Sequence, residues 1–266
     1  MRGAARWLLG LIVAGVAGAA DLPSGDEVVR RINARDDGHV VSRTMVMELS
    51  DRGGATRTRV TRSFRRDFGA ERRSVLFFEE PPNVRGTAFL AHDHPEPGRD
   101  DDYWLYLPAL RKSRRVASSE RGRSFLGTDL SYEELKKETK LNAEDFHWNR
   151  LDEEEVVEDR RCLVVEGTPV DEATARELGY GRVRLRVDAE LWLPRLAEFW
   201  GRSGSLQKTV RLLDVREVQG IWTVHRVEAV NHETGHRTTL IFRDVDYLDA
   251  VPEDLFSEEA LRRGAP

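Results

Sequence analysis

Alternation of apolar and polar residues runs through most of this chain and predicts a protein built mainly of β-strands. Successive side chains of a strand point to opposite faces, so residues two apart share a face. A first strand carries four apolar residues on one face, at Val41, Met45, Met47 and Leu49. A second strand carries three on one face, at Val60, Phe64 and Phe68. Arginines occupy several of the other positions of this second strand.

The same pattern predicts further strands along the rest of the chain. Gly53 and Gly54 lie between the first two strands and tolerate the positive φ of a hairpin turn. Later strands are predicted at residues 74–79, 85–92, 103–107, 153–159, 161–167, 182–188, 196–200, 206–215, 221–230 and 237–247. Several connections are too short for parallel crossovers, which need about a dozen residues or more. The expected topology is therefore an antiparallel meander.

Short helices are predicted beside these strands. Ser24 with Glu27, and Ser131 with Glu134, have the spacing of capping boxes. The first of these helices is expected to end near Gly38, and the second to reach about residue 140. A brief helix is predicted within residues 171–180.

The most informative segment begins at residue 103, where a predicted strand is apolar on both faces. Such a strand expects apolar neighbours on each side of the sheet, and Pro108 ends it. The chain then becomes abruptly basic over residues 110–115. Residues 125–128 follow, with Gly127 supplying backbone freedom before the Ser131 helix.

Residues 103–116 and 124–135, together with residues 80–90, form a layout that resembles the periplasmic outer-membrane lipoprotein-sorting family. This family is similar to the lipoprotein carrier and lipoprotein receptor, the LolA/LolB-like superfamily. Residues 251–257 look like the family's usual exit into a last short helix. The resemblance implies a mainly β fold with some α-helix: a strongly curved antiparallel sheet, forming an unclosed β-barrel. Short helices, including those at Ser24, Ser131 and the C-terminus, are expected to cover its concave apolar face.

The N-terminal residues 1–20 have the pattern of a secretory signal peptide. Arg2 and Arg6 precede an apolar run over residues 7–16, and small residues follow at 17–20. The mature protein is expected to begin near Asp21 and to form one domain over residues 21–266, although length alone would also allow two smaller units. No cysteine lies near the cleavage site, so we expect a soluble periplasmic protein and not a lipoprotein.

The remaining composition narrows the possible functions. Cys162 is the only cysteine, so no internal disulfide can form. It lies beside two arginines but has no partner histidine at an identifiable spacing, which favours a buried structural thiol. The net charge of −5 is modest and the two signs are interspersed, so nucleic acid is not expected as a partner.

The apolar residues of the predicted strands form either a filled core or the wall of a hollow barrel. Residues alone leave these alternatives open, because the same side chains can fill a barrel or surround a ligand. The family resemblance favours the hollow one. It then implies that acyl chains contact Met45, Met47, Phe64, Phe78, Phe89, Trp104, Tyr106, Leu126, Leu240 and Phe242.

Two further features are candidates for a role in binding. The basic residues Arg111, Lys112, Arg114 and Arg115 follow the doubly apolar strand. Arginine suits phosphate groups, so this cluster could contact a headgroup or a partner protein; an ordinary charged strand face is the alternative. Gly127 is the candidate hinge of a covering lid.

The residues His232, Glu233 and His236 match the spacing of a zinc hydrolase, but the flanking segments alternate as strands. Zinc chemistry requires both histidines on one face of a helix, so a hairpin turn is the better interpretation. His92 and His94 have no identifiable third ligand nearby and are expected to be surface histidines. We expect no metal and no cofactor.

These observations predict a non-enzymatic, monomeric periplasmic carrier that moves lipid or lipoprotein acyl chains toward the outer membrane. An inner-membrane transporter and an outer-membrane acceptor are its expected membrane partners. The alternative is a non-catalytic accessory protein of an inner-membrane lipid exporter that acts through protein contact. The zinc hydrolase is a second and weaker alternative.

Overall fold

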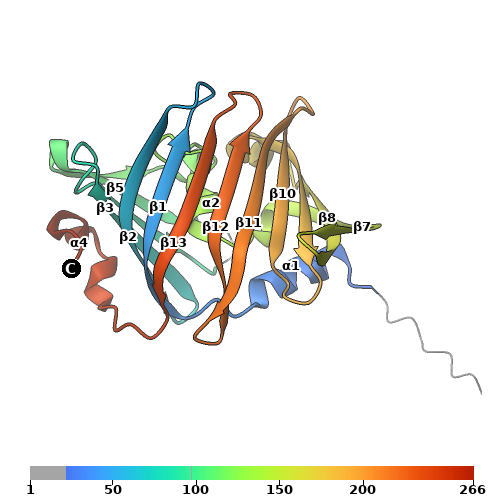
Figure 1. Cartoon of the computed structure of the whole chain (residues 1–266), viewed down its shortest axis with the longest axis horizontal. Coiled ribbons are helices and arrows are strands. Elements are labelled where there is room, and N and C mark those ends of the chain that lie inside the picture. Colours follow the sequence, from blue (N-terminus) through green and yellow to red (C-terminus); the bar gives the residue numbers. More distant parts are fainter. Residues whose placement is uncertain (1–21, 97) are drawn as a thin grey trace, which may run out of the picture.

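The computed structural model describes residues 22–96 and 98–266. Within these residues, thirteen strands form one antiparallel sheet in the order β6-β5-β4-β3-β2-β1-β13-β12-β11-β10-β9-β8-β7. The sheet curves without closing, with β6 and β7 as its two edges (Figure 1). The predicted unclosed, mainly β fold is confirmed. The predicted signal peptide, residues 1–20, lies outside the described residues.

The strands are long and connected mostly by tight turns. Their bounds are β1 (Val40–Ser50), β2 (Thr56–Phe68), β3 (Glu71–Glu80), β4 (Ala88–Asp93), β5 (Asp102–Leu107), β6 (Lys112–Val116), β7 (Phe146–Val157), β8 (Arg160–Pro169), β9 (Tyr180–Asp188), β10 (Pro194–Gly201), β11 (Leu206–Val218), β12 (Ile221–Asn231) and β13 (Arg237–Asp246). The helices are α1 (Gly25–Ala34), α2 (Tyr132–Lys137), α3 (Glu172–Leu178) and α4 (Glu258–Arg263), with 3₁₀ turns η1 (Pro108–Leu110), η2 (Ser118–Glu120), η3 (Ala143–Asp145) and η4 (Glu253–Phe256).

Helices α1 and α2 begin at the predicted caps. The Ser24 hydroxyl accepts a hydrogen bond from the Glu27 backbone N–H at 3.2 Å. Ser131 and Glu134 form a reciprocal capping box at the start of α2. This helix is shorter than expected and stops at Lys137, because Glu138 leaves the helical conformation with a φ of 55°.

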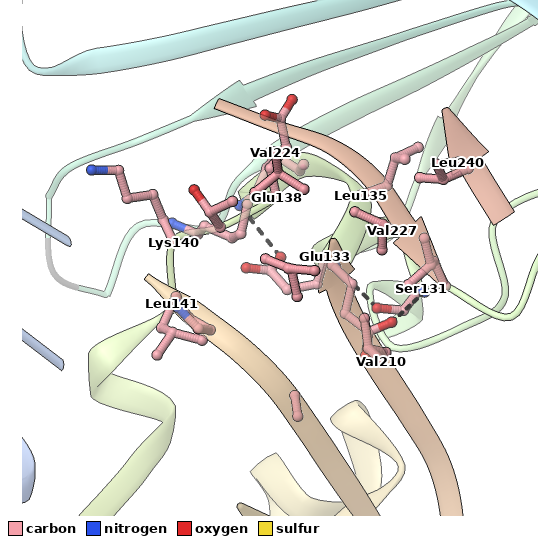
Figure 2. Close-up of a pocket in the computed structure, with 18 of the residues that line it drawn as sticks. Ser131, Glu133, Leu135, Glu138, Lys140, Leu141, Val210, Val224, Val227 and Leu240 are labelled. Carbon is pink, nitrogen blue, oxygen red and sulfur yellow. Dashed lines mark hydrogen bonds and ion pairs between the residues drawn. The ribbon is translucent and has the colours of Figure 1, made fainter. Parts of the chain in front are cut away.

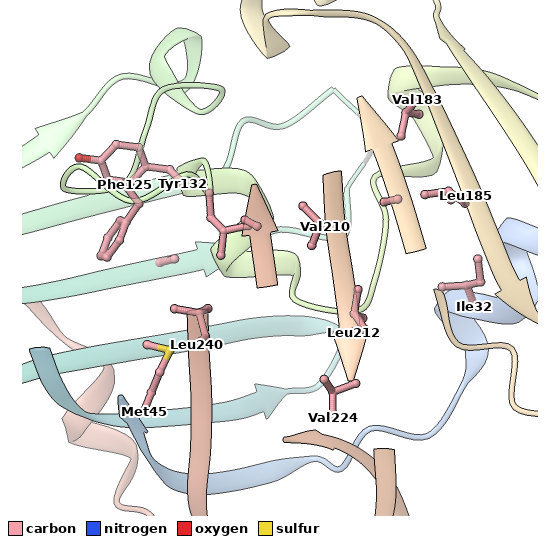
Figure 3. Packing of buried hydrophobic residues seen from close by; sticks show 14 of the residues in the cluster. Ile32, Met45, Phe125, Tyr132, Val183, Leu185, Val210, Leu212, Val224 and Leu240 are labelled. Carbon is pink, nitrogen blue, oxygen red and sulfur yellow. The ribbon is translucent and has the colours of Figure 1, made fainter. Parts of the chain in front are cut away.

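The concave face of the sheet carries the larger apolar core. Strand register determines this face, since residues directly opposite each other in neighbouring strands share a side. Met45 lies opposite Thr61 of β2 and Phe242 of β13. Helix α1 adds Val28, Val29 and Ile32 near the β7 and β8 end of the sheet. Figure 3 shows part of this core, including Ile32 of α1, Met45 of β1 and Leu240 of β13.

A second, smaller core lies on the opposite face of strands β2 to β5. It includes Phe64 and Phe77, and it is covered by η4 and α4 through Phe256 and Leu261. Phe256 packs edge-on against Phe68, with ring centroids 5.6 Å apart. The expectation that the C-terminal helix covers the opening is therefore wrong: α4 lies on the outer face (Figure 1).

Strand β5 has apolar neighbours on both faces, as predicted. Tyr103 and Leu105 belong to the concave core, whereas Trp104 and Tyr106 pack against the outer one. The ladder ends at Leu107, and Pro108 begins a 3₁₀ turn. This strand therefore links the two cores and fixes the outer helix relative to the concavity.

Cys162 is fully buried on β8, in agreement with the structural role expected of it. Burial, together with the nearby charge of Asp188, raises the pKa of its thiol to about 11. The thiolate is the reactive form of cysteine, so the folded protein keeps this residue unreactive at neutral pH.

We predict that Phe256→Ala lowers the free energy of unfolding by about 3–5 kcal/mol, because it leaves a cavity under α4. Urea unfolding followed by fluorescence measures this change. Leu248→Ala is the control, since Leu248 is 79% exposed and its truncation should cost less than about 0.5 kcal/mol. Equal effects of the two substitutions would mean that the outer core does not contribute to stability.

Candidate functional site

The connection between β6 and β7, residues 117–145, lies over the concave face and is here called the lid. Phe125, Leu130 and Tyr132 of the lid pack into the concave core. The Asp129 backbone N–H donates to the Thr238 hydroxyl of β13 at 2.9 Å, and that hydroxyl donates to the Asp129 carboxylate at 2.7 Å. The lid is thus attached to the middle of the sheet.

A cavity of about 180 Å³ lies between the lid and the concave face. Its apolar wall includes Met45, Phe89, Leu135, Val210, Val224 and Leu240. Figure 2 shows the lid residues Leu135 and Leu141 facing Val210, Val224, Val227 and Leu240 of the sheet. An apolar chain could replace water in such a space at a gain proportional to the area covered.

The size of this cavity limits what it can hold without movement. An engineered apolar cavity of about 150 Å³ accommodates benzene, whereas pockets for larger ligands measure roughly 300–1,000 Å³. The present volume therefore suits a short apolar segment. A long acyl chain would require the lid to move away from the sheet.

Charged side chains, and not only apolar ones, hold the lid in place. Where the lid leaves α2, Glu138 forms ion pairs with Arg43 of β1 and with Arg65 of β2, the latter at 3.3 Å. Lys140 donates to the Asn33 backbone carbonyl at 2.8 Å and lies 3.6 Å from Asp37. These contacts join the lid to β1, to β2, to the last turn of α1 and to the segment that follows α1.

Two further charged groups hold α2 itself. Lys208 of β11 donates to both carboxylate oxygens of Glu134, at 2.7 and 2.6 Å, and also to the Tyr180 hydroxyl. Lys137 of the same helix contacts Asp93 of β4 at 2.9 Å. Ion pairs therefore hold α2 to β11 and to β4, which lie on opposite sides of the β1–β13 pair in the sheet.

The ion pairs of Lys136 are the most deeply buried contacts of the lid, since this side chain is 2% exposed. Lys136 lies 3.3 Å from Glu133 and also pairs with Asp101. The Tyr103 hydroxyl donates to the Glu133 carboxylate at 2.7 Å. Burial and the charge of Glu133 raise the pKa of Tyr103 well above its usual range, so this hydroxyl stays protonated.

Two carboxyl groups of the lid contacts, Asp37 and Glu138, have lowered pKa values. Burial disfavours the charge of Asp37, but the charge of Arg65 and hydrogen bonds from Arg72 outweigh it and lower the pKa of the carboxyl. Burial also opposes the charge of Glu138, and the neighbouring Arg43 and Arg65 nevertheless lower its pKa. These carboxylates therefore stay charged throughout the neutral range.

Comparison with known proteins identifies the fold and family. An outer membrane lipoprotein-sorting protein domain from Vibrio parahaemolyticus is 30% identical, with a TM-score of 0.80 over 90% of this chain and 98% of that one. The chain belongs to the outer-membrane lipoprotein-sorting protein family. A DUF1329 family protein from Desulfovibrio piger is 26% identical, with a TM-score of 0.80 over 89% and 97% of the two chains.

Three further comparisons concern this member of the lipoprotein-sorting family. A LolA superfamily protein from Nitrosomonas europaea shares the fold at 19% identity, with a TM-score of 0.67 over 90% of this chain and all of that one. A family model described as "-like: Uncharacterized protein" matches residues 70–263. No curated protein matches the chain.

The structure brings four of the ten predicted acyl contacts to the cavity. Met45, Phe89, Leu240 and Phe242 line it. Met47 and Phe78 belong to the same core but do not line the cavity, and Leu126 packs against that core from the lid. Met45 and Met47 meet Phe242 and Leu240 because β1 pairs with β13.

Three of the predicted contacts lie on the wrong face. Phe64, Trp104 and Tyr106 belong to the outer core beneath η4 and α4. The error follows from register: Phe64 lies opposite Ser42 of β1, while the concave positions of β2 are the polar Ser63 and Arg65. The wall of the cavity at β2 is therefore polar.

The predicted basic cluster forms the free edge of the sheet. Arg111 precedes β6, and Lys112, Arg114 and Arg115 lie exposed on it. Arg115 pairs with Asp102 of β5. The cluster lies outside the lining of the cavity, so a role at the cavity rim has no support in the geometry.

Gly127 lies in a tight turn of the lid, between the bridged residues Ser124 and Ser131. Its φ is 80°, and Leu126 before it also has a positive φ of 46°. An added Cβ at Gly127 would meet nothing within 4 Å, so only the backbone conformation requires glycine there.

The histidine motif is a hairpin turn, as expected. Residues 232–236 connect β12 to β13, and Gly235 has a φ of 74°. Among residues 22–96 and 98–266, no three potential ligands gather in a geometry that could hold a metal ion. The expectation that His92 and His94 are surface residues is wrong, since the His94 side chain is 3% exposed and pairs with Asp102 at 2.9 Å.

Sequence reasoning missed the charged residues that hold the lid. The first hairpin contains the information for part of this network. If its turn spans residues 51–55, Ser50 lies opposite Thr56, and the antiparallel register then places Met45 opposite Thr61. That register assigns Arg43 and Arg65 to the same face as Met45. Their partner Glu138 is distant in the chain, as Lys208 is from its partner Glu134, and no local pattern reveals these contacts.

We predict that Asp37→Asn lowers the free energy of unfolding by about 3 kcal/mol at neutral pH, because it leaves Arg65 and Arg72 without their shared carboxylate. The pKa of Asp37 is lower in the folded state, so its contribution is present above the unfolded value of about 4 and is lost as the pH falls through the folded value. Urea unfolding of both proteins from pH 7 downward should show the difference shrinking below about pH 4.

Glu253→Gln provides the matched control for this prediction. Glu253 also pairs with an arginine, Arg66, but its side chain is 67% exposed. Exposed ion pairs contribute less than about 1 kcal/mol. A pH-independent effect of Asp37→Asn would contradict an electrostatic origin.

Proposed function

We propose that this protein is a non-catalytic periplasmic carrier that shields acyl chains of lipids or lipoproteins in the cavity beneath its lid. The observation that carries the proposal is the apolar cavity enclosed between a curved sheet and a covering segment held by polar contacts. Family membership supports it, because the Vibrio relative is described as an outer membrane lipoprotein-sorting protein domain.

The energetics of such a carrier are favourable. Removing an acyl chain from water gains about 0.8 kcal/mol per CH₂, so a dozen groups give about 10 kcal/mol. Binding costs, including the ordering of the chain and of the lid, reduce this value. Enough remains for the protein to hold an acyl chain while crossing an aqueous compartment.

The chemistry of the lid suits repeated opening. Its contacts with the sheet include ion pairs through Glu134, Glu138 and Lys140, and water can solvate these groups when the contacts separate. Apolar contacts through Phe125 and Leu130 would instead be lost to water. The acyl chain would replace them with new apolar surface as the lid moves.

A periplasmic location rests on the predicted signal peptide, and the family description supports it. No helix in the described part of the chain has the length and apolar character to cross a membrane. We propose that the domain of residues 21–266 exchanges acyl chains with an inner-membrane transporter and an outer-membrane acceptor. The exposed basic edge strand β6 is available for contact with such a partner.

The direct test is native mass spectrometry of the mature protein purified from periplasm, followed by organic extraction. A stoichiometric acyl-bearing species would support the carrier and give its cargo class. Reproducible absence of such a species, together with no uptake of an added fluorescent fatty acid, would reject the proposal.

We predict that Val210→Trp abolishes or strongly weakens acyl binding, because the indole would fill the cavity from β11. Titration with a fluorescent fatty acid measures the change. Val156→Trp is the matched control, since Val156 is 73% exposed and lies outside the cavity lining. Unchanged binding to Val210→Trp would show that the ligand binds elsewhere.

We predict that Gly127→Val slows ligand exchange, because a β-branched residue is strained at the positive φ of this turn. Stopped-flow transfer of a fluorescent fatty acid to vesicles measures the rate. Gly54→Val carries similar strain in the β1–β2 hairpin, which is remote from the lid, and should exchange ligand at the normal rate. Equal rates for all three proteins would reject Gly127 as a hinge.

A further inference from the structure

One end of the cavity carries an excess of buried positive charge. Four cationic side chains line this end, which is here called the cationic end: Arg35, Arg43, Arg65 and Lys140. The acidic side chains among them are two, Asp37 and Glu138. Charged groups in protein interiors are normally matched in number, since an uncompensated buried charge is costly.

The two carboxylates are already shared among several cations. Asp37 accepts hydrogen bonds from Arg65 at 3.2 Å and from Arg72 at 2.7 and 3.1 Å. Glu138 accepts from Arg43 and from Arg65. Neither carboxylate can fully compensate any one of these guanidinium groups.

Donor groups at the cationic end also lack partners. The Nε–H groups of Arg35, Arg43 and Arg65 are buried and have no hydrogen bond to any described residue. Arg43 is 8% exposed and Arg65 is 4% exposed. A buried donor without a partner costs about 1–3 kcal/mol. The arginines that carry these three donors all line the cavity, so its cationic end holds positive groups that the protein itself satisfies incompletely.

The cationic end continues directly into the apolar part of the cavity. The Arg43 guanidinium lies 4.4 Å from the centroid of the Phe242 ring, and both residues line the cavity with Met45. Figure 2 shows Lys140 and Glu138 on one side of the pocket, with Ser131 and Val210 on the other. A ligand with one charged group and one apolar chain matches this arrangement.

We propose that the cationic end binds the anionic group, a carboxylate or a phosphate, of an amphiphile whose acyl chain occupies the apolar part of the cavity. This inference rests on the proposed acyl-binding function and assigns the chemistry of the headgroup. Arginine presents planar donors that match both anions and is well suited to desolvated sites.

The other charged groups that line the cavity offer no comparable excess. Glu134 is matched by Lys208. Lys136 is surrounded by Glu133, Asp101 and Asp93. An anion would be repelled by these acids, so the cationic end is the favourable position for it.

The pKa of Lys140 provides a way to detect an anion at the cationic end. Burial, with the charges of Arg35, Arg72 and Arg65 and despite Asp37, lowers the pKa of this ammonium to about 8. Burial is the largest cause, and the arginine charges act in the same direction, so this ammonium loses its proton more easily than an exposed lysine. An anion bound beside it would raise this pKa, so ligand binding near pH 8 should take up protons.

The test compares ligands that share one chain and differ in the headgroup. Decanoate, decyl phosphate and decanol compete for the mature wild-type protein against the uncharged fluorescent probe N-phenylnaphthylamine, below their aggregation concentrations. A carboxylate or a phosphate should bind at least about tenfold more tightly than the alcohol, as expected for charge-assisted hydrogen bonds. The stronger of the two anions distinguishes a fatty acid from a phosphate-bearing lipid.

Variants locate the anion. Arg43→Gln should remove most of the preference for the anion and retain binding of decanol. Arg35→Gln is a second, less buried variant that should act in the same direction if Arg43→Gln fails to fold. Arg114→Gln, on the exposed edge strand, should preserve the preference; its loss there would overturn the proposal and favour a headgroup site on β6.

The remaining outcomes separate this inference from the function on which it rests. Equal affinity of the wild-type protein for all three ligands would overturn the anion site and leave acyl binding intact. Failure of all three ligands to displace the probe would reject both. Proton uptake when the anion binds near pH 8, and none when decanol binds, would support the assignment to the cationic end.

Discussion

The pairing of β1 with β13 is the contact on which the rest of the structure depends. It joins two strand series, β1 to β6 and β13 to β7, that would otherwise form separate sheets. Met45 lies opposite Phe242, and Met47 lies opposite Leu240, across this ladder. The cavity wall, the stacking of Arg43 on Phe242 and the anchoring of the lid on Thr238 all follow from this pairing. A long-range pairing of this kind must form before either half has a complete core.

Local chemistry made much of the fold predictable. The caps at Ser24 and Ser131, and the end of β5 before Pro108, depend on neighbouring residues, and each lies where the sequence indicates. The choice of face was less predictable, because both faces of β2 to β5 carry apolar residues. Phe64 was assigned to the concavity on its apolar character alone, whereas the C-terminal segment, nearly two hundred residues later, covers it. The family resemblance predicted helices that cover the concave face. The register of the first hairpin could have placed Arg43 and Arg65 on that face, but no local pattern indicates their distant partner Glu138.

The lid combines two kinds of contact that respond differently to water. Apolar packing through Phe125 and Leu130 makes closure favourable, while the ion pairs of Glu134 and Glu138 determine where the lid rests. Buried ion pairs add little net stability, because desolvation offsets their attraction, but they penalise alternative positions strongly. The lid can therefore be precisely positioned without being tightly held. Such a balance suits a segment that must separate from the sheet and return to the same place.

The two free edges of the sheet have a mechanical consequence. In a closed barrel the ladder hydrogen bonds fix the circumference, so the lumen cannot widen unless some of them break. Here β6 and β7 are not paired with each other, and the sheet can change its curvature while every ladder bond is kept. The width of the concavity, measured across the strands from β6 to β7, can therefore change. In the carrier proposed above, compliance of this kind would let one cavity accept chains of different length and branching.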